Sequence, residues 1–195
     1  MPNWCDNSLT IRHADKTKLD ELEAELNKDG EAELLRHFRP YEGDVWDYGW
    51  CVENWGTKWE ARIIDWERTA DDTIYVTFET AWGPPVALYE YIEQDGWEVQ
   101  GLYNEPGMAF AGIYEEGADH YYEYSDLSAD EIEENLPEIL EETYGIAQYK
   151  RDWEDEQEEE EWDGATEEPS GLTEQEMEQA LTELKEEFDK LNGKK

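Results

Sequence analysis

Hydrophobic and polar residues alternate at the start of the chain in a pattern that predicts one strand followed by one helix. The alternation over residues 8–12 is typical of a short, half-buried strand. Three leucines at helical spacing then predict a helix that begins after Asp15 and ends at Gly30. Residues 31–58 are expected to be irregular, because glycine and proline interrupt any regular period there.

The same analysis predicts a hairpin and a second helix in the middle of the chain. Apolar residues over 59–66 and 73–80 predict two strands, which the polar turn 69–72 joins. The paired prolines that follow predict a helix start, since the first turn of a helix does not need a proline N–H. This helix is expected to run to about Gln94.

Three more strands are predicted over 97–103, 109–114 and 120–124. The order strand, helix, strand, strand, helix, strand is the βαββαβ order of a split βαβ sandwich. We therefore expect an α+β fold: a ferredoxin-like βαββαβ antiparallel sheet with helices on one face, an extra C-terminal hairpin and an acidic helical extension.

The pattern changes after residue 125, so we predict a domain over 1–125 and an extension over 126–195. Ser128 and Glu131 form a capping-box signature, and Pro137 should kink the following segment or split it into two short helices. Residues 152–168 hold 11 acids in 17 positions, and we expect a flexible stretch near 152–171.

A second capping box begins a helix whose apolar residues recur at alternating steps of four and three over 173–192. This coiled-coil-like seam spans about two heptads. One interpretation is a helix that packs back on its own domain. The other is a helix that forms a weak homo-oligomer.

The chain carries 54 acidic and 15 basic residues, for a formal net charge of −39. The net charge is −14 over residues 1–100 and −25 over 101–195. Charge of this size repels phosphate, which excludes ordinary nucleic-acid binding and binding to anionic membrane faces. We expect a protein partner with a basic surface instead.

Catalytic and metal-binding patterns are absent from the sequence. The three histidines are far apart, and Cys5 and Cys51 are interpreted as buried structural thiols. Residues 152–163 have the acid density of a calcium loop but not its glycine at position six, so only diffuse cation condensation is expected. We therefore expect no enzymatic activity, no cofactor and no specific metal site.

Neither a secretion signal nor an apolar run of about 20 residues is recognisable, which indicates a cytoplasmic protein without a membrane span.

An aromatic cluster lies in the segment predicted to be irregular, at Trp46, Tyr48, Trp50, Trp55 and Trp59. Exposed indoles on such a loop can stack ligands. The alternative is a long loop that packs over the sheet.

Three motifs carry a resemblance to a known family: MPNWCDNSL over 1–9, ENWGTKW over 53–59 and FETAWGPP over 78–85. They resemble a family of uncharacterised proteins carried by bacteriophages, prophages and plasmids. The resemblance covers roughly residues 1–115, with Gly83 where many relatives have Ser. It implies a ferredoxin-like domain and a mobile-element setting, hence the host cell cytoplasm, but no reaction and no established site.

The motif residues are our candidates for a partner-binding surface: Trp4, Asn7, Trp55, Thr57, Lys58, Trp59, Trp82, Pro84 and Pro85. The alternative interpretation is structural. In it Asn7 and Thr57 fix turns, the tryptophans pack together under the sheet, and Lys58 is an internal ion-pair partner.

The first functional hypothesis is a non-enzymatic phage-type interaction protein that presents an acidic surface in place of DNA and so inhibits a host defence or nucleic-acid-binding protein. A helix over 152–168 would carry about one charge per 2.3 Å, against about one per 1.7 Å of duplex DNA. The alternative is a small-ligand or protein-binding module that uses the Trp-rich loop, with acidity serving solubility.

The candidate acidic surface consists of Asp152, Glu154, Asp155, Glu156, Glu158, Glu159, Glu160, Glu161 and Asp163.

Overall fold

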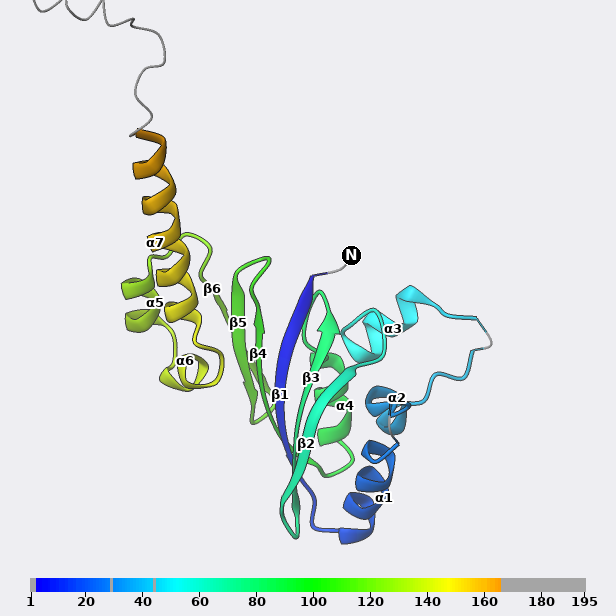
Figure 1. Ribbon diagram of the computed structural model, residues 1–195. Helices are drawn as coiled ribbons and strands as arrows, with labels where there is room; N and C mark the ends of the chain where they lie inside the picture. The colour runs from blue at the N-terminus through cyan, green and yellow to red at the C-terminus, as the bar shows by residue number, and fades with distance from the viewer. Residues whose placement is uncertain (1–2, 29, 44, 166–195) are drawn as a thin grey trace, which may run out of the picture. The chain divides into compact units, whose positions relative to one another are not determined.

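The protein is an α+β protein with a six-stranded antiparallel sheet in the order β2-β3-β1-β4-β5-β6 (Figure 1). The computed structural model describes residues 3–28, 30–43 and 45–165, the side chains of 158–165 excepted. The chain divides into two compact units, 1–150 and 151–195.

The strands are β1 (Trp4–Arg12), β2 (Arg62–Ala70), β3 (Thr73–Ala81), β4 (Glu98–Glu105), β5 (Phe110–Glu115) and β6 (Ala118–Glu123). The helices of the described residues are α1 (Lys16–Leu26), α2 (Leu34–Phe38), α3 (Tyr48–Trp55), α4 (Val86–Glu93), α5 (Ala129–Asn135), α6 (Glu138–Tyr144) and α7 (Ile146–Ala165).

Strand β1 lies at the centre of the sheet and pairs antiparallel with both β3 and β4. It begins four residues earlier than the hydrophobic alternation predicted. Its added residues include the buried Cys5 and Asn7, which continue the odd-numbered face formed by Leu9 and Ile11. A strand face is set by residue parity, so a buried Asn can belong to it when its amide is hydrogen bonded.

The first hydrophobic cluster lies between the odd-numbered face of β1 and the helices α1 and α4. The leucines of α1 are buried in it as their spacing predicted, and Asp15 caps the helix by accepting a hydrogen bond from Thr17 N at 2.9 Å. Helix α4 contributes Leu88, Tyr89 and Ile92, and Pro85 stands at its N-cap.

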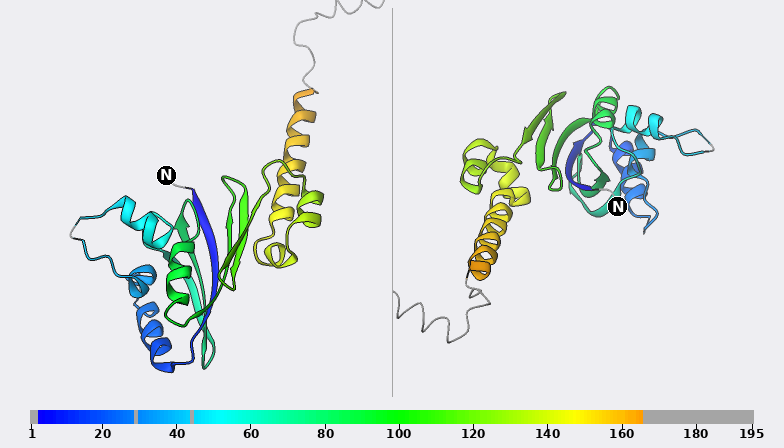
Figure 2. Two further views of the ribbon diagram at one scale, coloured as in Figure 1. Left: turned by 180° about the vertical axis from the view of Figure 1, so that it is seen from behind. Right: turned by 90° about the horizontal axis from the view of Figure 1, so that it is seen from above.

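A second hydrophobic cluster lies on the opposite face of the sheet. Leu102 belongs to it, whereas Val99 of the same strand belongs to the first cluster, and an odd separation along a strand turns side chains to opposite faces. Ile132 of α5 and Leu140 of α6 complete the second cluster, and these helices lie beside β5 and β6 in Figure 2. The expectation of helices on one face is therefore wrong: helices cover both faces.

The predicted hairpins form, with shifted bounds. The turn between β2 and β3 is shorter than predicted and consists of Asp71 and Asp72. The added hairpin turns at Glu116 and Gly117, both with positive φ (51° and 75°). Two left-handed residues give a turn whose twist matches that of the flanking strands.

Helices α2 and α3 lie in the segment that was expected to be irregular. Helix α3 has its own local signals: Asp47 accepts a hydrogen bond from Trp50 N at 3.0 Å, and Gly56 ends it in a left-handed conformation (φ 90°). Five-residue α2 depends on a distant residue instead. The Glu60 carboxylate accepts hydrogen bonds from Leu35 N at 2.6 Å and Arg36 N at 3.1 Å.

Three helices of the described residues follow residue 125. Helix α5 has the predicted capping box between Ser128 and Glu131, and Pro137 separates α5 from α6. Both helices belong to the compact unit 1–150. Helix α7 is regular as far as Ala165, across most of the stretch expected to be flexible. The predicted seam over 173–192 lies outside the described residues.

Glu60 makes the stability of this fold pH dependent. Burial raises the pKa of its carboxyl from about 4.5 to about 7, despite the hydrogen bonds that favour the carboxylate. The folded state therefore binds this proton more tightly than the unfolded state. The resulting stabilisation is complete below about pH 4.5 and is lost as the pH rises through about 7.

We expect the free energy of unfolding to fall by about 3 kcal/mol more in the wild type than in Glu60→Gln between pH 4.5 and pH 8. The glutamine can still accept backbone hydrogen bonds but does not ionise. Urea denaturation across this range measures both curves. Parallel curves would show that Glu60 does not carry the effect.

Candidate functional site

Three indole rings surround the Lys58 ammonium group in a surface cluster that we call the tryptophan–lysine patch (Trp46, Lys58, Trp59 and Trp82). Lys58 Nζ lies 4.3 Å from the Trp59 ring centroid, 4.6 Å from that of Trp82 and 6.0 Å from that of Trp46. These distances are within the range of cation–π attraction. Lys58 and Trp59 precede β2 and Trp82 follows β3. This end of the two strands lies next to α3 in Figure 1.

The rings of the patch are exposed to solvent. The exposed fraction is 51% for Trp46, 36% for Trp59 and 49% for Trp82. Trp4 extends the aromatic surface, since its ring lies 6.4 Å from that of Trp59 and is also 36% exposed. Indoles clustered on a surface are typical of a contact site, because a core would have buried them.

Lys58 is not the internal ion-pair partner that the structural interpretation required. Among the described residues its ammonium group makes no ion pair and no hydrogen bond, although the chain has 54 acids. Its side chain is held over π faces instead. The neighbouring Arg62 behaves differently: it lies 5.3 Å from the Trp4 ring centroid and also pairs with Glu79.

Trp82 has a left-handed backbone conformation, with φ 71°. A bulky residue in this region is strained, and such strain persists only where surrounding contacts fix it. Trp82 N donates to Asn3 O at 3.0 Å. On either side, Thr57 Oγ1 donates to Ala81 O at 2.9 Å and Thr80 Oγ1 donates to Gly83 O at 2.8 Å.

Asn7 stabilises this turn from the buried side of β1. Its Nδ2 donates to Thr80 Oγ1 at 2.9 Å and to Cys5 O at 2.8 Å, and all three residues are buried. Asn7 and Thr57 therefore position the turn that carries Trp82 and do not reach the surface. These hydrogen bonds agree with the structural interpretation that Asn7 and Thr57 fix turns.

The remaining motif residues belong to the interior or to the start of α4. Trp55 is 2% exposed, and its Nε1 donates to Arg39 O at 3.0 Å. Pro85 is buried at the N-cap of α4 and Pro84 is half-buried. Gly56 fits against the same helix start: a Cβ atom there would lie 3.0 Å from Val86 N.

The structure thus brings Trp4, Lys58, Trp59 and Trp82 together on the surface and separates them from the buried Trp55. Sequence reasoning missed Arg62, which no motif contains. It noted Trp46 in the aromatic cluster but did not connect it with Lys58. Trp46 Nε1 donates to Lys58 O at 3.2 Å, a contact with no signature in the sequence.

A second feature is the segregation of charge within the folded unit. The acidic segment, which we define as residues 69–149, contains 20 acids and no lysine or arginine. It comprises every element from β3 to α6. Glu79 and Asp95 pair with Arg62 and Lys18 from outside the segment.

Tyrosine hydroxyls hold two carboxylates of the acidic segment. Tyr103 Oη donates to Asp119 Oδ1 and Tyr114 Oη donates to Glu93 Oε2, each at 2.7 Å. Burial and the carboxylate partners raise the pKa of both tyrosines. These donors are therefore neutral at any physiological pH.

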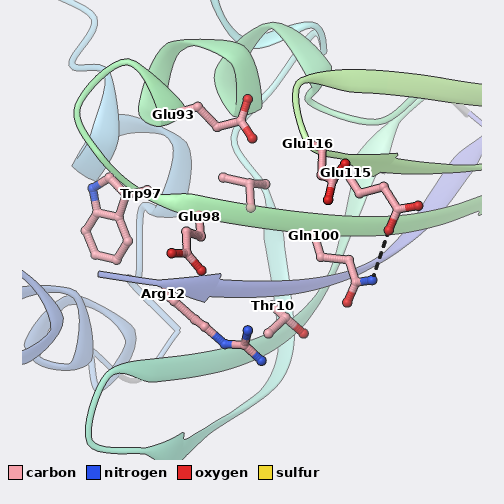
Figure 3. Close-up of a pocket in the computed structure, with 9 residues that line it drawn as sticks. Thr10, Arg12, Glu93, Trp97, Glu98, Gln100, Glu115 and Glu116 are labelled. Atoms are coloured by element: carbon pink, nitrogen blue, oxygen red, sulfur yellow. Dashed lines mark hydrogen bonds between the residues drawn. The ribbon is translucent and has the colours of Figure 1, made fainter. Parts of the chain in front are cut away.

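A cavity of about 530 Å³ opens within the same part of the sheet (Figure 3). Four glutamates line it together with Thr10 and Arg12 of β1, and Arg12 is the cross-strand partner of one of them, Glu98. Gln100 Nε2 donates to Glu115 Oε2 at 3.3 Å across one wall. The glutamates are Glu93, Glu98, Glu115 and Glu116.

The acidic residues predicted from 152 onward lie on helix α7. Asp152, Asp155 and Glu156 are exposed and Glu154 is half-buried. The side chains of Glu158, Glu159, Glu160, Glu161 and Asp163 lie outside the described residues, although the backbone there is helical.

The buried thiols show no activation. Cys5 and Cys51 are at most 1% exposed, and burial raises the pKa of each, so both remain protonated. Across the described ranges no three His, Cys, Asp or Glu residues are grouped as metal ligands. In the same ranges no helix is long and apolar enough to cross a membrane.

Comparisons with known proteins give a structural likeness. No family model and no curated protein matches the sequence. Part of the chain is similar in structure to the crystal structure of protein api92 from Yersinia pseudotuberculosis, described by the DUF1281 family model, with a TM-score of 0.35 and 18% identity. The match covers 49% of this chain and 40% of that protein, so this chain spans less than half of its length.

The strain at Trp82 is expected to reverse the usual order of stability, in which an alanine variant is more stable than a glycine variant. We expect Trp82→Gly to be more stable than Trp82→Ala by about 1 kcal/mol, because glycine adopts a left-handed conformation without strain. Both variants lose the same ring contacts, so their difference isolates the backbone. Thermal or urea unfolding measures it.

The matched control is Trp59, whose φ is not positive. There the glycine variant should be less stable than the alanine variant. An alanine variant that is the more stable one at both positions would contradict strain at Trp82.

Proposed function

We propose that this protein is a non-enzymatic interaction protein that presents a folded acidic face in place of DNA to a basic nucleic-acid-binding or defence protein. The observation that carries the proposal is the acidic segment 69–149, with 20 acids and no lysine or arginine. A solubility tail would be acidic outside the folded unit. Here 15 of the 20 acids stand on strands and helices, where the fold fixes their spacing.

Fixed carboxylates suit a partner whose groove is built for phosphates. Each charge is already in place before binding, so less conformational entropy is lost on association than with a disordered acidic tail. Helix α7, taken by itself, carries nine acids over 152–165, about one charge per 2.3 Å of helix, against about one per 1.7 Å of duplex DNA.

The cavity of Figure 3 supports the same proposal at the scale of one side chain. Its volume of about 530 Å³ admits a lysine or arginine, and Glu98, Glu115 and Glu116 would receive the cation. Such a contact is charge assisted and directional, which favours a defined partner over general attraction of cations.

The mobile-element setting of the proposal rests on the resemblance of the three sequence motifs. A protein of this kind would act in the host cell cytoplasm against a host defence enzyme. We also propose that β1, α1, β2, β3, α4 and β4 form a ferredoxin-like core. The antiparallel order β2-β3-β1-β4 supports this assignment, with α2 and α3 inserted before β2.

Affinity capture from host lysate with the intact protein, followed by salt elution and competition with duplex DNA, tests the proposed function. We expect a nucleic-acid-binding partner that duplex DNA displaces and that dissociates as the salt concentration rises, because the contacts are ionic. Neutralisation of three acids by the combined substitution Glu98→Gln, Glu115→Gln and Glu116→Gln should weaken binding about tenfold at low salt.

A matched control removes the same charge outside the acidic segment, by Glu21→Gln, Glu31→Gln and Glu67→Gln. This control should bind within about twofold of the wild type. Equal losses in both triple variants would show that total charge, not the acidic segment, governs binding. Capture that duplex DNA does not compete would contradict the DNA-like role.

A further inference from the structure

The tryptophan–lysine patch has the geometry of a cation cage. Trp59 and Trp82 hold the Lys58 ammonium group at 4.3 Å and 4.6 Å from their ring centroids, and Trp46 closes a third side at 6.0 Å. Several aromatic faces around one ammonium group are the arrangement that proteins use to bind alkylammonium ligands. Here a lysine of the same chain occupies the cage.

Lys58 can be displaced without breaking an ion pair that the structure describes. Among the described residues no carboxylate or carbonyl oxygen binds its ammonium group, so the π faces provide the attraction that the structure shows. Its four-carbon side chain rotates freely once released. The backbone stays in place meanwhile, because Lys58 O accepts the hydrogen bond from Trp46 Nε1.

The cage is maintained against a cost to the fold. Trp82 keeps a left-handed backbone and a ring that is 49% exposed, so packing does not explain its position. The buried residues Asn7, Thr57 and Thr80 make the hydrogen bonds that fix its turn. Strain retained at an exposed aromatic residue is typical of a binding site.

The charge of the protein selects the ligand. With a net charge of −39, the surrounding potential favours cations and disfavours anions such as phosphate or a nucleotide. When an incoming ammonium group replaces Lys58, one cation still lies over the same rings. A methylated ammonium group would gain further, because it is less strongly hydrated and fits the π faces as well.

We infer that the tryptophan–lysine patch is a displaceable cation cage, which Lys58 fills in the free protein and an alkylammonium group of a basic partner, a lysine or methylated lysine side chain, fills in the complex. The inference rests on the proposed function only for the source of this group. The cage itself is a property of this chain and can be measured without any partner.

The test is a titration of tetramethylammonium chloride followed by tryptophan fluorescence and by the indole N–H signals in NMR spectra. Lys58→Ala empties the cage, so this variant should bind the probe in the millimolar range. The wild type should bind it at least tenfold more weakly, because the probe must displace Lys58. The double variant Lys58→Ala, Trp82→Gly should not bind.

Two controls separate the cage from general electrostatics. Lys16→Ala removes the same charge from the exposed face of α1 and should behave as the wild type does. The neutral isostere 3,3-dimethylbutanol should not bind Lys58→Ala, since it has the shape of the probe without its charge. NMR spectra of each variant report whether it is folded.

Three outcomes would overturn the inference: a folded Lys58→Ala that does not bind tetramethylammonium, equal affinity for the neutral isostere, or binding of inorganic phosphate by the wild type that Lys58→Ala abolishes. The last outcome would identify an anion site. Tetramethylammonium binding with no partner in host lysate would leave the cage in place and contradict the proposed function alone.

Discussion

The pairing of β1 with both β3 and β4 is the contact on which the rest of the structure depends. This strand places Leu9 and Ile11 in the first hydrophobic cluster and is flanked by β4, which carries Leu102 of the second. Apolar burial on both faces is what offsets the mutual repulsion of so many acids. The same strand supplies Asn7, which fixes the turn before Trp82, so stability and the candidate site share one element.

Charge and aromatic surface occupy different parts of this frame. The bases of the folded unit, apart from Lys150, come from residues 12–68, and the acidic segment follows them as one block. The tryptophan–lysine patch takes residues from both stretches, since Lys58 precedes β2 and Trp82 follows β3. A basic partner drawn to the acidic segment would therefore find an aromatic anchor at its border, and such anchors carry most of the binding energy in protein interfaces.

Local signals predicted most elements of the fold. The leucine spacing of α1 and the capping box of α5 are set by neighbouring residues, and each forms as expected. The turn at Glu116 and Gly117 is also set locally. Helix α2 could not be predicted, because Glu60, 25 residues away from Leu35, supplies its first hydrogen-bond acceptor. The helices on the second face of the sheet were not predicted for a related reason. Leu102 and Val99 are both apolar residues of one strand, and the sheet places their side chains on opposite faces.

The candidate site was predictable in its members but not in its geometry. The motifs contain Lys58, Trp59 and Trp82. The sequence does not show, however, that Trp55 is buried and Trp82 is exposed. What separates them is the left-handed turn at Trp82, and its cause lies in hydrogen bonds from Asn7 and Thr57 across the fold. The acidic segment, by contrast, can be seen in the sequence alone, because no lysine or arginine occurs between Arg68 and Lys150.

The tyrosine hydroxyls that hold Asp119 and Glu93 determine how the acidic segment responds to salt. An ion pair orients a carboxylate and cancels its charge together, and salt weakens both effects. A neutral hydroxyl orients the carboxylate and leaves its full charge facing outward. Concentrated salt that loosens the pairs of Lys18 and Arg68 would leave these tyrosine-bound carboxylates in position. Ionic strength can thus screen the charge of this surface without disordering the surface itself.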